Sequence, residues 1–372
     1  MSTLPETTRC PHSTCPSTTS AKPPRFVKHS FLRTGSGKKQ RWRCKSCGGT
    51  FTRSTGTPYH RLRFPASKLD LALTLSLEGT SQAAISRALE VSRSTIGRWV
   101  DRAASHARTF NETIIRGVDA YEVQADEIRS YGQGSGARSW VFNTIEVWSR
   151  LWLSTKTGSR TLGNCLALLR DSRRRCIAST ACVLISTDGY PGYPSAVRQA
   201  WGASCCHGVT NKIFRGGTIR RVHKNYVLGS ESQFEAAFER SEDSEDLNTA
   251  YIERLNLLIR RALVCLHRRT SSAPQSRTKL EDLIELLRCY YNFVRRHGAL
   301  KFGPEVRTPA QQAGLVTRRI SFRDIFSAFR PGSRVRWISD RRRRVEWQMV
   351  SWAATLDATC STAGRRRVAL AG

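Results

Sequence analysis

Three carboxylates at separate points of the chain have the chemistry of metal ligands. They are Asp126 in "AYEVQADEIRSY", Asp188 in "STDGYPGY" and Glu253 in "LNTAYIERLNLLIRR". An aspartate inside an apolar strand costs free energy unless a charged group compensates it, and a divalent metal does so. Three hard oxygen ligands suit Mg²⁺ or Mn²⁺. Two such ions about 4 Å apart can activate an attacking hydroxyl and stabilise the leaving oxygen of a phosphodiester.

The hydrophobic pattern predicts the elements that would bring these acids together. From about residue 118 to residue 188, β-branched and aromatic runs predict four strands, with a helix over residues 159–174 before the last of them. This β-β-β-α-β series builds a mixed sheet flanked by helices, with Asp126 in its first strand and Asp188 at the end of its fourth. We expect the two aspartates on neighbouring strands.

The third acid lies in a predicted amphipathic helix over residues 247–261. Glu253, Asn256 and Arg260 share one face of it. The helix would bury a stripe made of Ile252, Leu255, Ile259, Ala262, Leu263 and Leu266. Packed beside the strand ends, it would complete a three-acid cluster, with surrounding arginines holding a DNA backbone.

Each acid also has a purely structural interpretation. Asp188 could be a turn residue before glycine, and Glu253 could be an intrahelical partner of a nearby arginine. Asp126 is followed by Glu127, and because side chains alternate along a strand only one of the two acids would face the site. The neighbouring residues leave that choice open.

Four cysteines near the N-terminus have the spacing of a second metal site. Cys10 and Cys15 lie in "RCPHSTC", and Cys44 and Cys47 lie in "RWRCKSCGGTF". Four thiolates close a tetrahedral zinc site with bonds of about 2.3 Å, and the metal replaces a core that so short a segment cannot build. We therefore predict a zinc ribbon over residues 8–57. His12 is an alternative ligand to Cys15, and four unrelated thiols are the structural alternative.

Residues 62–110 have the layout of a helix-turn-helix. Ser81 and Ser92 are placed as N-caps of two short helices that a tight turn separates. The second helix would project a polar set toward a major groove, namely Arg93, Ser94, Thr95 and Arg98. A plain helical hairpin with a solvated basic face is the alternative.

Composition favours a polyanionic partner. Of the 372 residues, 61 are Lys or Arg and 29 are Asp or Glu, which gives a formal charge of +32. No apolar run approaches the roughly 18 residues that span a bilayer, and the first residues lack a signal layout. We expect a cytoplasmic protein with no membrane partner. The remaining cysteines fit small apolar fillers: Cys165, Cys176, Cys182, Cys205, Cys206, Cys265, Cys289 and Cys360.

From about residue 8 to about residue 316, the chain resembles bacterial insertion-sequence transposases with a zinc ribbon, a helix-turn-helix and an RNase H-like DDE catalytic domain. "RWRCKSCGGTFTRSTGTPYHRLR" is similar to their ribbon knuckle and exit segment. "ADEIRSYG", "STDGYPGYPSAV" and "NTAYIERLNLLIRR" resemble their three acidic motifs, and "YYNFVRRHGALKFG" with "TPAQQAGL" resembles their closing segment. The resemblance implies that Asp126, Asp188 and Glu253 are catalytic.

The resemblance also implies a reaction and its partners. Water attacks a phosphodiester to free a 3′-OH, and that hydroxyl then attacks target DNA, with no covalent protein intermediate. The partners would be double-stranded DNA, namely the terminal inverted repeats of the element and the target. Pairing two ends implies at least a homodimer, associated with the nucleoid. Asn256 and Arg260 would join the DNA-binding residues.

We therefore expect a multidomain α/β chain: a zinc ribbon (8–57), a helix-turn-helix domain (62–110), an RNase H-like catalytic domain (118–316) and a basic C-terminal extension (317–372). The extension mixes arginine runs with Trp337, Trp347 and Trp352, which could grip nucleic acid or belong to a frayed basic terminus. Two other functions stay open. One is a catalytically silent, sequence-specific DNA-binding regulator derived from a transposase, and the other is a nuclease that cleaves without joining.

Overall fold

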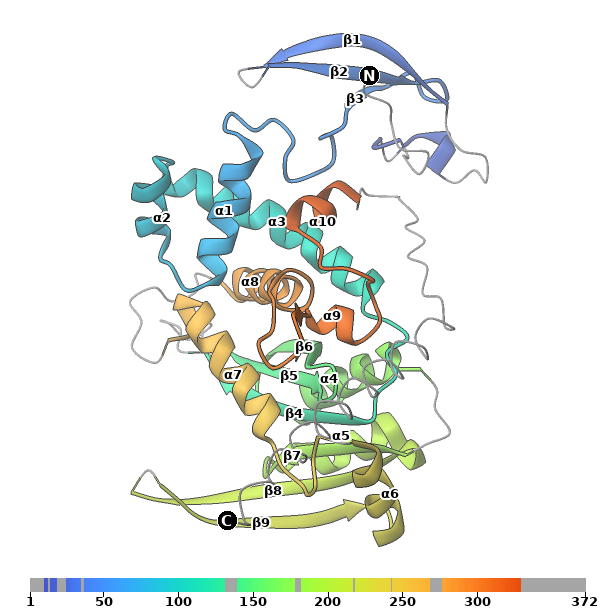
Figure 1. Ribbon diagram of the computed structural model, residues 1–372, viewed down its shortest axis with the longest axis vertical. Helices are drawn as coiled ribbons and strands as arrows, with labels where there is room; N and C mark the ends of the chain where they lie inside the picture. Colours follow the sequence, from blue (N-terminus) through green and yellow to red (C-terminus); the bar gives the residue numbers. More distant parts are fainter. Residues whose placement is uncertain are drawn as a thin grey trace, which may run out of the picture.

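The computed structural model describes residues 10–12, 14–18, 25–34, 37–130, 139–177, 182–216, 218–241, 243–267 and 276–328. The protein is mixed α/β, with a six-stranded sheet, helices on both faces of that sheet, and a separate small sheet near the N-terminus (Figure 1). Most of the predicted basic extension, including its three tryptophans, lies outside the described residues, and so does Cys360.

The small sheet is a three-stranded antiparallel meander. It consists of β1 (Phe26–Thr34), β2 (Gly37–Cys44) and β3 (Thr50–Thr52), preceded by a 3-10 turn, η1 (Pro16–Thr18). Its buried core is limited to five side chains: Cys10, Cys15, Trp42, Cys44 and Phe51. So small an apolar core cannot stabilise a fold of this size alone, which leaves a cross-link among the cysteines as the remaining source of stability.

Three helices connect this sheet to the rest of the molecule: α1 (Ala66–Leu77), α2 (Gln82–Leu89) and α3 (Arg93–Ile114). Gly79 ends α1 with a φ of +87°, which lets the Thr80 amide donate to the Leu75 carbonyl at 3.0 Å. Ser81 and Ser92 accept hydrogen bonds from amides in the first turns of α2 and α3, so both predicted N-caps are confirmed. Helix α3 runs four residues past residue 110, the predicted end of the helix-turn-helix domain.

The six strands of the large sheet lie in the order β6-β5-β4-β7-β8-β9. They are β4 (Glu122–Arg129), β5 (Trp140–Glu146), β6 (Leu151–Gly158), β7 (Val183–Asp188), β8 (Cys205–Arg215) and β9 (Thr218–Leu228). The pairs β4–β7 and β7–β8 are parallel, and the other pairs are antiparallel. With α4 (Leu162–Arg175) between β6 and β7, the predicted β-β-β-α-β series is confirmed.

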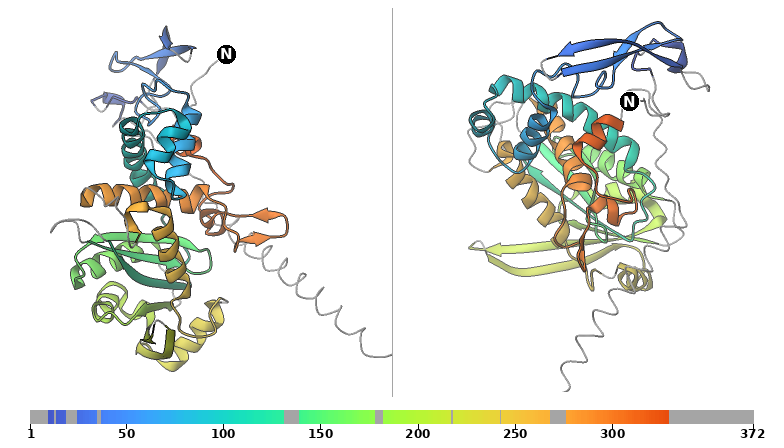
Figure 2. Two further views of the ribbon diagram at one scale, coloured as in Figure 1. Left: turned by 90° about the vertical axis from the view of Figure 1, so that its left-hand side faces the viewer. Right: turned by 45° about the horizontal axis from the view of Figure 1, so that its top comes forward.

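Helices cover the two faces of this sheet in pairs (Figures 1 and 2). On one face lie α4 and α5 (Gly192–Trp201), the latter ending in a 3-10 turn, η2 (Gly202–Ser204). On the other face lie α6 (Glu231–Ser241) and α7 (Ala250–Ala262), which a second 3-10 turn, η3 (Val264–Leu266), extends. All six residues of the stripe predicted for α7 and its extension are buried. The sheet side chains therefore alternate between two helical layers, as the period of two requires.

The last described residues, 276–328, pack partly against α3. Helix α8 (Arg277–Cys289) continues into a π-helical turn (Tyr290–Val294), and β10 (Lys301–Phe302), β11 (Glu305–Val306), α9 (Pro309–Gln312) and α10 (Phe322–Ala328) follow. Residues 322–328, assigned above to the basic extension, pack beside α1 and the segment before it: the Phe326 and Tyr59 rings lie 6.0 Å apart, and Arg323 pairs with Asp70 at 2.8 Å. None of the described helices combines the length and the apolarity needed to cross a membrane.

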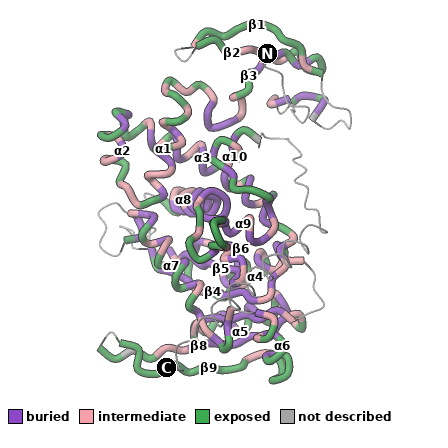
Figure 3. The backbone as a smooth tube through the Cα atoms, viewed as in Figure 1, coloured by how far each residue is buried: buried purple, intermediate pink, exposed green. Residues whose placement is uncertain are grey.

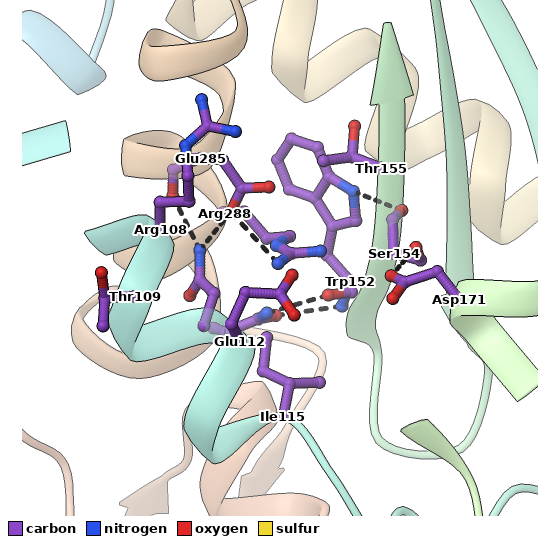
Figure 4. Close-up of polar contacts among 12 residues, drawn as sticks. Arg108, Thr109, Glu112, Ile115, Trp152, Ser154, Thr155, Asp171, Glu285 and Arg288 are labelled. Carbon is purple, nitrogen blue, oxygen red and sulfur yellow. Dashed lines mark hydrogen bonds and ion pairs between the residues drawn. The ribbon is translucent and has the colours of Figure 1, made fainter. Parts of the chain in front are cut away.

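Buried polar contacts join α3 to α4 and α8. Figure 4 shows the contacts between α3 and α8, and the contact of Ser154 in β6 with Asp171 in α4. Arg175 donates to the carbonyls of Asn111 and Ile115 at 3.2 and 3.1 Å, which satisfies acceptors at the C-terminal end of α3. Burial acts to raise the pKa of Asp171, but the paired Arg175 outweighs it and lowers that pKa to about 2. Asn111 donates to the Glu285 carboxylate at 2.7 Å. These contacts fix the end of α3 against the sheet domain.

The C-terminal end of α3 allows a test of the hydrophobic core that the three N-terminal helices share with the sheet domain. Phe110 is fully buried, and its ring meets Phe293 edge to face with centroids 4.8 Å apart. Because Phe110→Ala leaves a cavity in this contact, we expect it to lower the free energy of unfolding by about 3–5 kcal/mol in urea titrations. The matched control is Thr109→Ala on the exposed side of α3, expected to stay within about 0.5 kcal/mol of wild type. Equal stabilities for the two variants would contradict the packing.

Candidate metal centres

Two clusters of potential metal ligands lie in the described part of the chain. The first contains Asp126, Glu127 and Asp188, whose nearest carboxylate oxygens all lie within 4.8 Å of one another. Because β4 and β7 are parallel and Ala125 is in register with Thr187, Asp126 and Asp188 come next to each other. Asp188 is the last residue of β7, and Asp126 lies three residues before the end of β4. The predicted placement of the two aspartates on neighbouring strands is confirmed.

The close approach of these acids changes their ionisation. Burial raises the pKa of Asp126 to about 7, and the charges of Asp188 and Glu127 add to the rise. Burial likewise raises the pKa of Glu127, with Asp188 contributing. Burial also raises the pKa of Asp188, and Glu253 adds to that rise. The three carboxylates lie close enough together to share one cation, and a set of hard oxygen donors suits a divalent ion.

Asp126 is held on the side of the sheet that α7 covers. Its Oδ1 accepts from the Glu127 amide at 2.7 Å, and its Oδ2 accepts from the Asn256 side chain at 2.9 Å. Asn256 in turn accepts from Asn143 of β5 at 2.9 Å and is only 3% exposed. Both ends of the Asn256 amide are thus used inside the protein. The residue lies buried beneath Asp126 and orients that carboxylate, so in this arrangement its side chain is not free for the predicted DNA contact.

Glu253 lies one helical turn before Asn256 and faces the same region, since its charge raises the pKa of Asp188. It is not a member of the close cluster of three acids. Its Oε1 instead accepts from Lys212 of β8 and from the Thr249 hydroxyl. Arg260 is half-buried two turns further along α7, and its Nε has no partner among the described residues. The predicted helix is therefore present, but the Glu253 side chain points to Lys212 and not into the close cluster of acids.

Glu127 is the acid that the sequence could not separate from Asp126. It faces the opposite helical layer, where its carboxylate accepts from the Tyr193 hydroxyl at 2.9 Å and from Arg160 Nε at 2.7 Å. The Arg160 guanidinium lies over the Tyr190 ring, 4.1 Å from its centroid. Because both acids lie near the end of β4, their carboxylates approach each other despite pointing to different faces. The alternation of side chains along the strand could therefore not predict that both Asp126 and Glu127 belong to the cluster.

Gln124 is a positioning residue that the sequence did not single out. It lies two residues before Asp126 on the same face of β4. Its Oε1 accepts from the backbone amides of Tyr251 and Ile252 in α7, at 3.0 and 3.1 Å. Gln124 thereby caps the first turn of α7, where Thr249 makes no side-chain cap of its own. A buried amide two residues from a candidate ligand is the signal that could have identified it.

The second cluster is formed by Cys10, Cys15, Cys44 and Cys47, whose sulfur atoms all lie within 4.8 Å of one another. The Cys10–Cys47 and Cys15–Cys44 sulfur distances are 3.6 and 3.7 Å. A tetrahedral metal with thiolate bonds of about 2.3 Å requires ligand separations of about 3.8 Å, so the four thiols fit one ion. This is a possible four-cysteine metal site, and Cys15, the alternative to His12, belongs to it.

The residues predicted to read DNA lie at the start of α3. Arg93, Ser94 and Arg98 are exposed, whereas Thr95 is half-buried. The Thr95 hydroxyl accepts from Arg98 at 3.2 Å, so the two side chains are held together on this surface. The turn between α2 and α3 contains Glu90 with a φ of +54°, which brings the two helices close. An exposed polar surface therefore exists where the sequence placed one.

A scan against protein-family models finds no match for this chain, and no curated protein matches it.

The raised carboxyl pKa values predict how stability depends on pH in the metal-free protein. Because of its raised pKa, Asp126 keeps its proton in the folded state to higher pH, so it stabilises the fold below its unfolded pKa of about 4 and loses this contribution as pH rises through about 7. We expect the free energy of unfolding after chelator treatment to fall over this range, by at most about 1.4 kcal/mol per pH unit for each such group. Urea titrations from pH 4.5 to pH 8 measure it.

The fall should be smaller for Asp126→Asn, which removes one titrating member of the cluster. The control is Glu235→Gln on the exposed surface of α6, which should keep the wild-type pH profile. A profile for Asp126→Asn that is parallel to that of the wild type would show that the Asp126 carboxyl is not the source of the pH dependence.

Proposed function

We propose that this protein is a DDE transposase, a metal-dependent enzyme that cleaves DNA at the ends of an insertion sequence and transfers the strands. The observation that carries the proposal is the close approach of Asp126 and Asp188 at the ends of parallel strands, with Glu253 presented beside them by α7. Acids that are at least half-buried and this close together cost free energy unless a cation compensates their charge.

The sheet supports an RNase H-like assignment for the catalytic part. Its first three strands form an antiparallel meander, the fourth strand pairs in parallel with the first, and the fifth pairs in parallel with the fourth. In this arrangement the first and fourth strands are neighbours, which is the condition for one acid from each to meet. Fold alone does not define a reaction, so the acids rather than the sheet carry the proposal.

Divalent ions, Mg²⁺ or Mn²⁺, held by Asp126, Asp188 and Glu253 would supply the charge that activates an attacking hydroxyl and stabilises the leaving oxygen. Asn256 and the Glu127 amide keep both oxygens of Asp126 oriented. Gln124 fixes the start of α7, so Glu253 stays beside the strand ends. Lys212, now paired with Glu253, is a cation available to a phosphate when that carboxylate turns to the ions.

The parts outside the sheet fit recognition of double-stranded DNA. The exposed start of α3 is proposed as the reading helix of a helix-turn-helix, with Arg93, Ser94, Thr95 and Arg98 at the major groove. The four-cysteine site is proposed to hold Zn²⁺ as a zinc ribbon. Substrates would be terminal inverted repeats and target DNA, bound in the nucleoid by a homodimer or larger assembly that pairs two ends. The formal charge of +32 suits such partners.

One observation favours a second function, a catalytically silent regulator that binds specific DNA and was derived from a transposase. Glu253 is paired with Lys212 and lies outside the close cluster of acids. A chain that keeps this ion pair permanently would hold at most an incomplete catalytic site. Such a protein would bind the ends without cutting them.

The catalytic proposal is tested with a labelled duplex that carries the DNA flanking the coding sequence, in Mg²⁺ or Mn²⁺. We expect wild type to cleave and join strands, and Asp126→Asn, Asp188→Asn and Glu253→Gln each to lower the rate by at least about 10³-fold, because each removes charge from the ion site. Binding of the duplex should be retained. Glu235→Gln is the matched control with full activity. Wild-type binding without cleavage in either metal supports the regulator, and cleavage without joining supports a nuclease.

The zinc proposal is tested by metal analysis of the purified chain. We expect one zinc ion per chain, lost in Cys10→Ser/Cys44→Ser because two of four ligands are removed. Cys165→Ala is the matched control, since that thiol is buried in the main core away from the cluster. His12→Ala should keep the ion, because His12 is not a member of the cluster. Zinc retained by the double cysteine variant would refute the assignment.

A further inference from the structure

The last two strands of the sheet form a projecting two-stranded ribbon. Strand β8 pairs with β7 only as far as Thr210, which is in register with Asp188. From Asn211 onward, β8 has β9 as its only ladder partner in the described part of the chain. Figure 1 shows these strands running on beyond the rest of the sheet. We define residues 211–216 and 218–223 as the ribbon. It begins beside the acid cluster and leads away from it.

The ribbon is exposed and strongly basic. Every residue from Thr218 to Tyr226 is exposed, which Figure 3 shows along β9. Residues 205–228 contain no Asp or Glu and five Lys or Arg: Lys212, Arg215, Arg220, Arg221 and Lys224. Lys212 pairs with Glu253 and Lys224 with Asp246. Within the described residues no carboxylate pairs with Arg215, Arg220 or Arg221, so these three charges are available to a polyanion.

Apolar and basic side chains share both faces of the ribbon. Ile213 is opposite Arg221 on one face, and Lys212 is opposite Val222 on the other. Ile213, Ile219 and Val222 are 49%, 47% and 42% exposed. This mixture suits a groove of a duplex, where cations reach phosphates and apolar groups meet bases or sugars.

We propose that the β8–β9 ribbon enters a groove of the DNA duplex next to the acid cluster and holds it mainly through the backbone. The major groove admits a two-stranded ribbon of this kind. Arg215 lies five residues beyond Thr210, roughly 17 Å along a strand, which corresponds to about five base pairs from the cluster. The inference rests on the proposed function in placing the duplex at the acids.

A second copy of the chain is the other candidate for this exposed edge, since β9 has an unpaired side. Edge-to-edge pairing of two β9 strands would bring Arg220, Arg221 and Lys224 of both copies together. Like charges in that position destabilise a sheet. Charge complementarity therefore favours the duplex.

The test compares two double variants of the full chain. Arg220→Gln/Arg221→Gln removes two charges from the ribbon. Arg170→Gln/Arg198→Gln is the control and removes two exposed charges from α4 and α5, on the face of the sheet opposite to α7. Binding to a duplex of about 30 base pairs is measured from about 50 to 200 mM salt. For the ribbon variant we expect the slope of log affinity against log salt to become shallower by about 1.8, and affinity near 100 mM to fall roughly ten- to sixtyfold.

The control variant should retain the wild-type slope. The ribbon variant should lose affinity equally for the flanking DNA and for an unrelated duplex, because backbone contacts carry no sequence information. Ile213→Ser/Ile219→Ser should weaken duplex binding several-fold without changing the slope, since it removes no charge.

Three results would overturn the inference: a ribbon variant that behaves like its control, an equal loss of affinity for single-stranded DNA, or a loss of dimer mass in light scattering with an unchanged salt slope. The last result would assign β9 to a second copy. Wild-type cleavage is scored separately. A protein that never cuts but shows the expected change in slope refutes the proposed function and leaves the ribbon inference standing.

Discussion

The mutual repulsion of buried carboxylates is the constraint on which the rest of the structure depends. Asp126, Glu127 and Asp188 approach within 4.8 Å, and burial raises the pKa of each. Left alone, such a cluster would open or stay protonated. It is kept in place because each acid is bound from a different direction: Asp126 from α7, Glu127 from α5 and the Arg160 side chain, and Asp188 by the Tyr190 amide.

The need to bind each carboxylate explains why each polar side chain of β4 points toward a polar partner on one of the two covering helical layers. On the α7 face, Gln124 caps the helix and Asp126 meets Asn256. On the other face, Glu127 bonds to Tyr193. A strand in which three of four successive residues are polar would be unstable in an apolar sheet without these partners. The helices on the two faces thus serve the site as well as the core.

Much of this arrangement could be predicted from the sequence, because periodicity and turn residues are local signals. The strand series, both serine N-caps and the buried stripe of α7 follow from spacing alone. The partners of each side chain could not be predicted. Asn256 and Arg260 share a helix face in the sequence pattern, yet only tertiary packing shows that Asn256 lies beneath Asp126. Likewise, Glu127 and Gln124 gain their roles from residues more than 30 positions away.

The packing of α10 beside α1 has a consequence for how the protein comes to be folded. Arg323 and Asp70 are 253 residues apart in the chain, and Tyr59 lies against Phe326 at the same contact. At about 5–20 residues per second, a ribosome completes α10 roughly 13 to 50 s after α1 has been made. Until then the nascent chain exposes part of the surface that α10 will cover. The helical unit therefore reaches its final packing only after residue 328 has been made, long after its own three helices α1, α2 and α3.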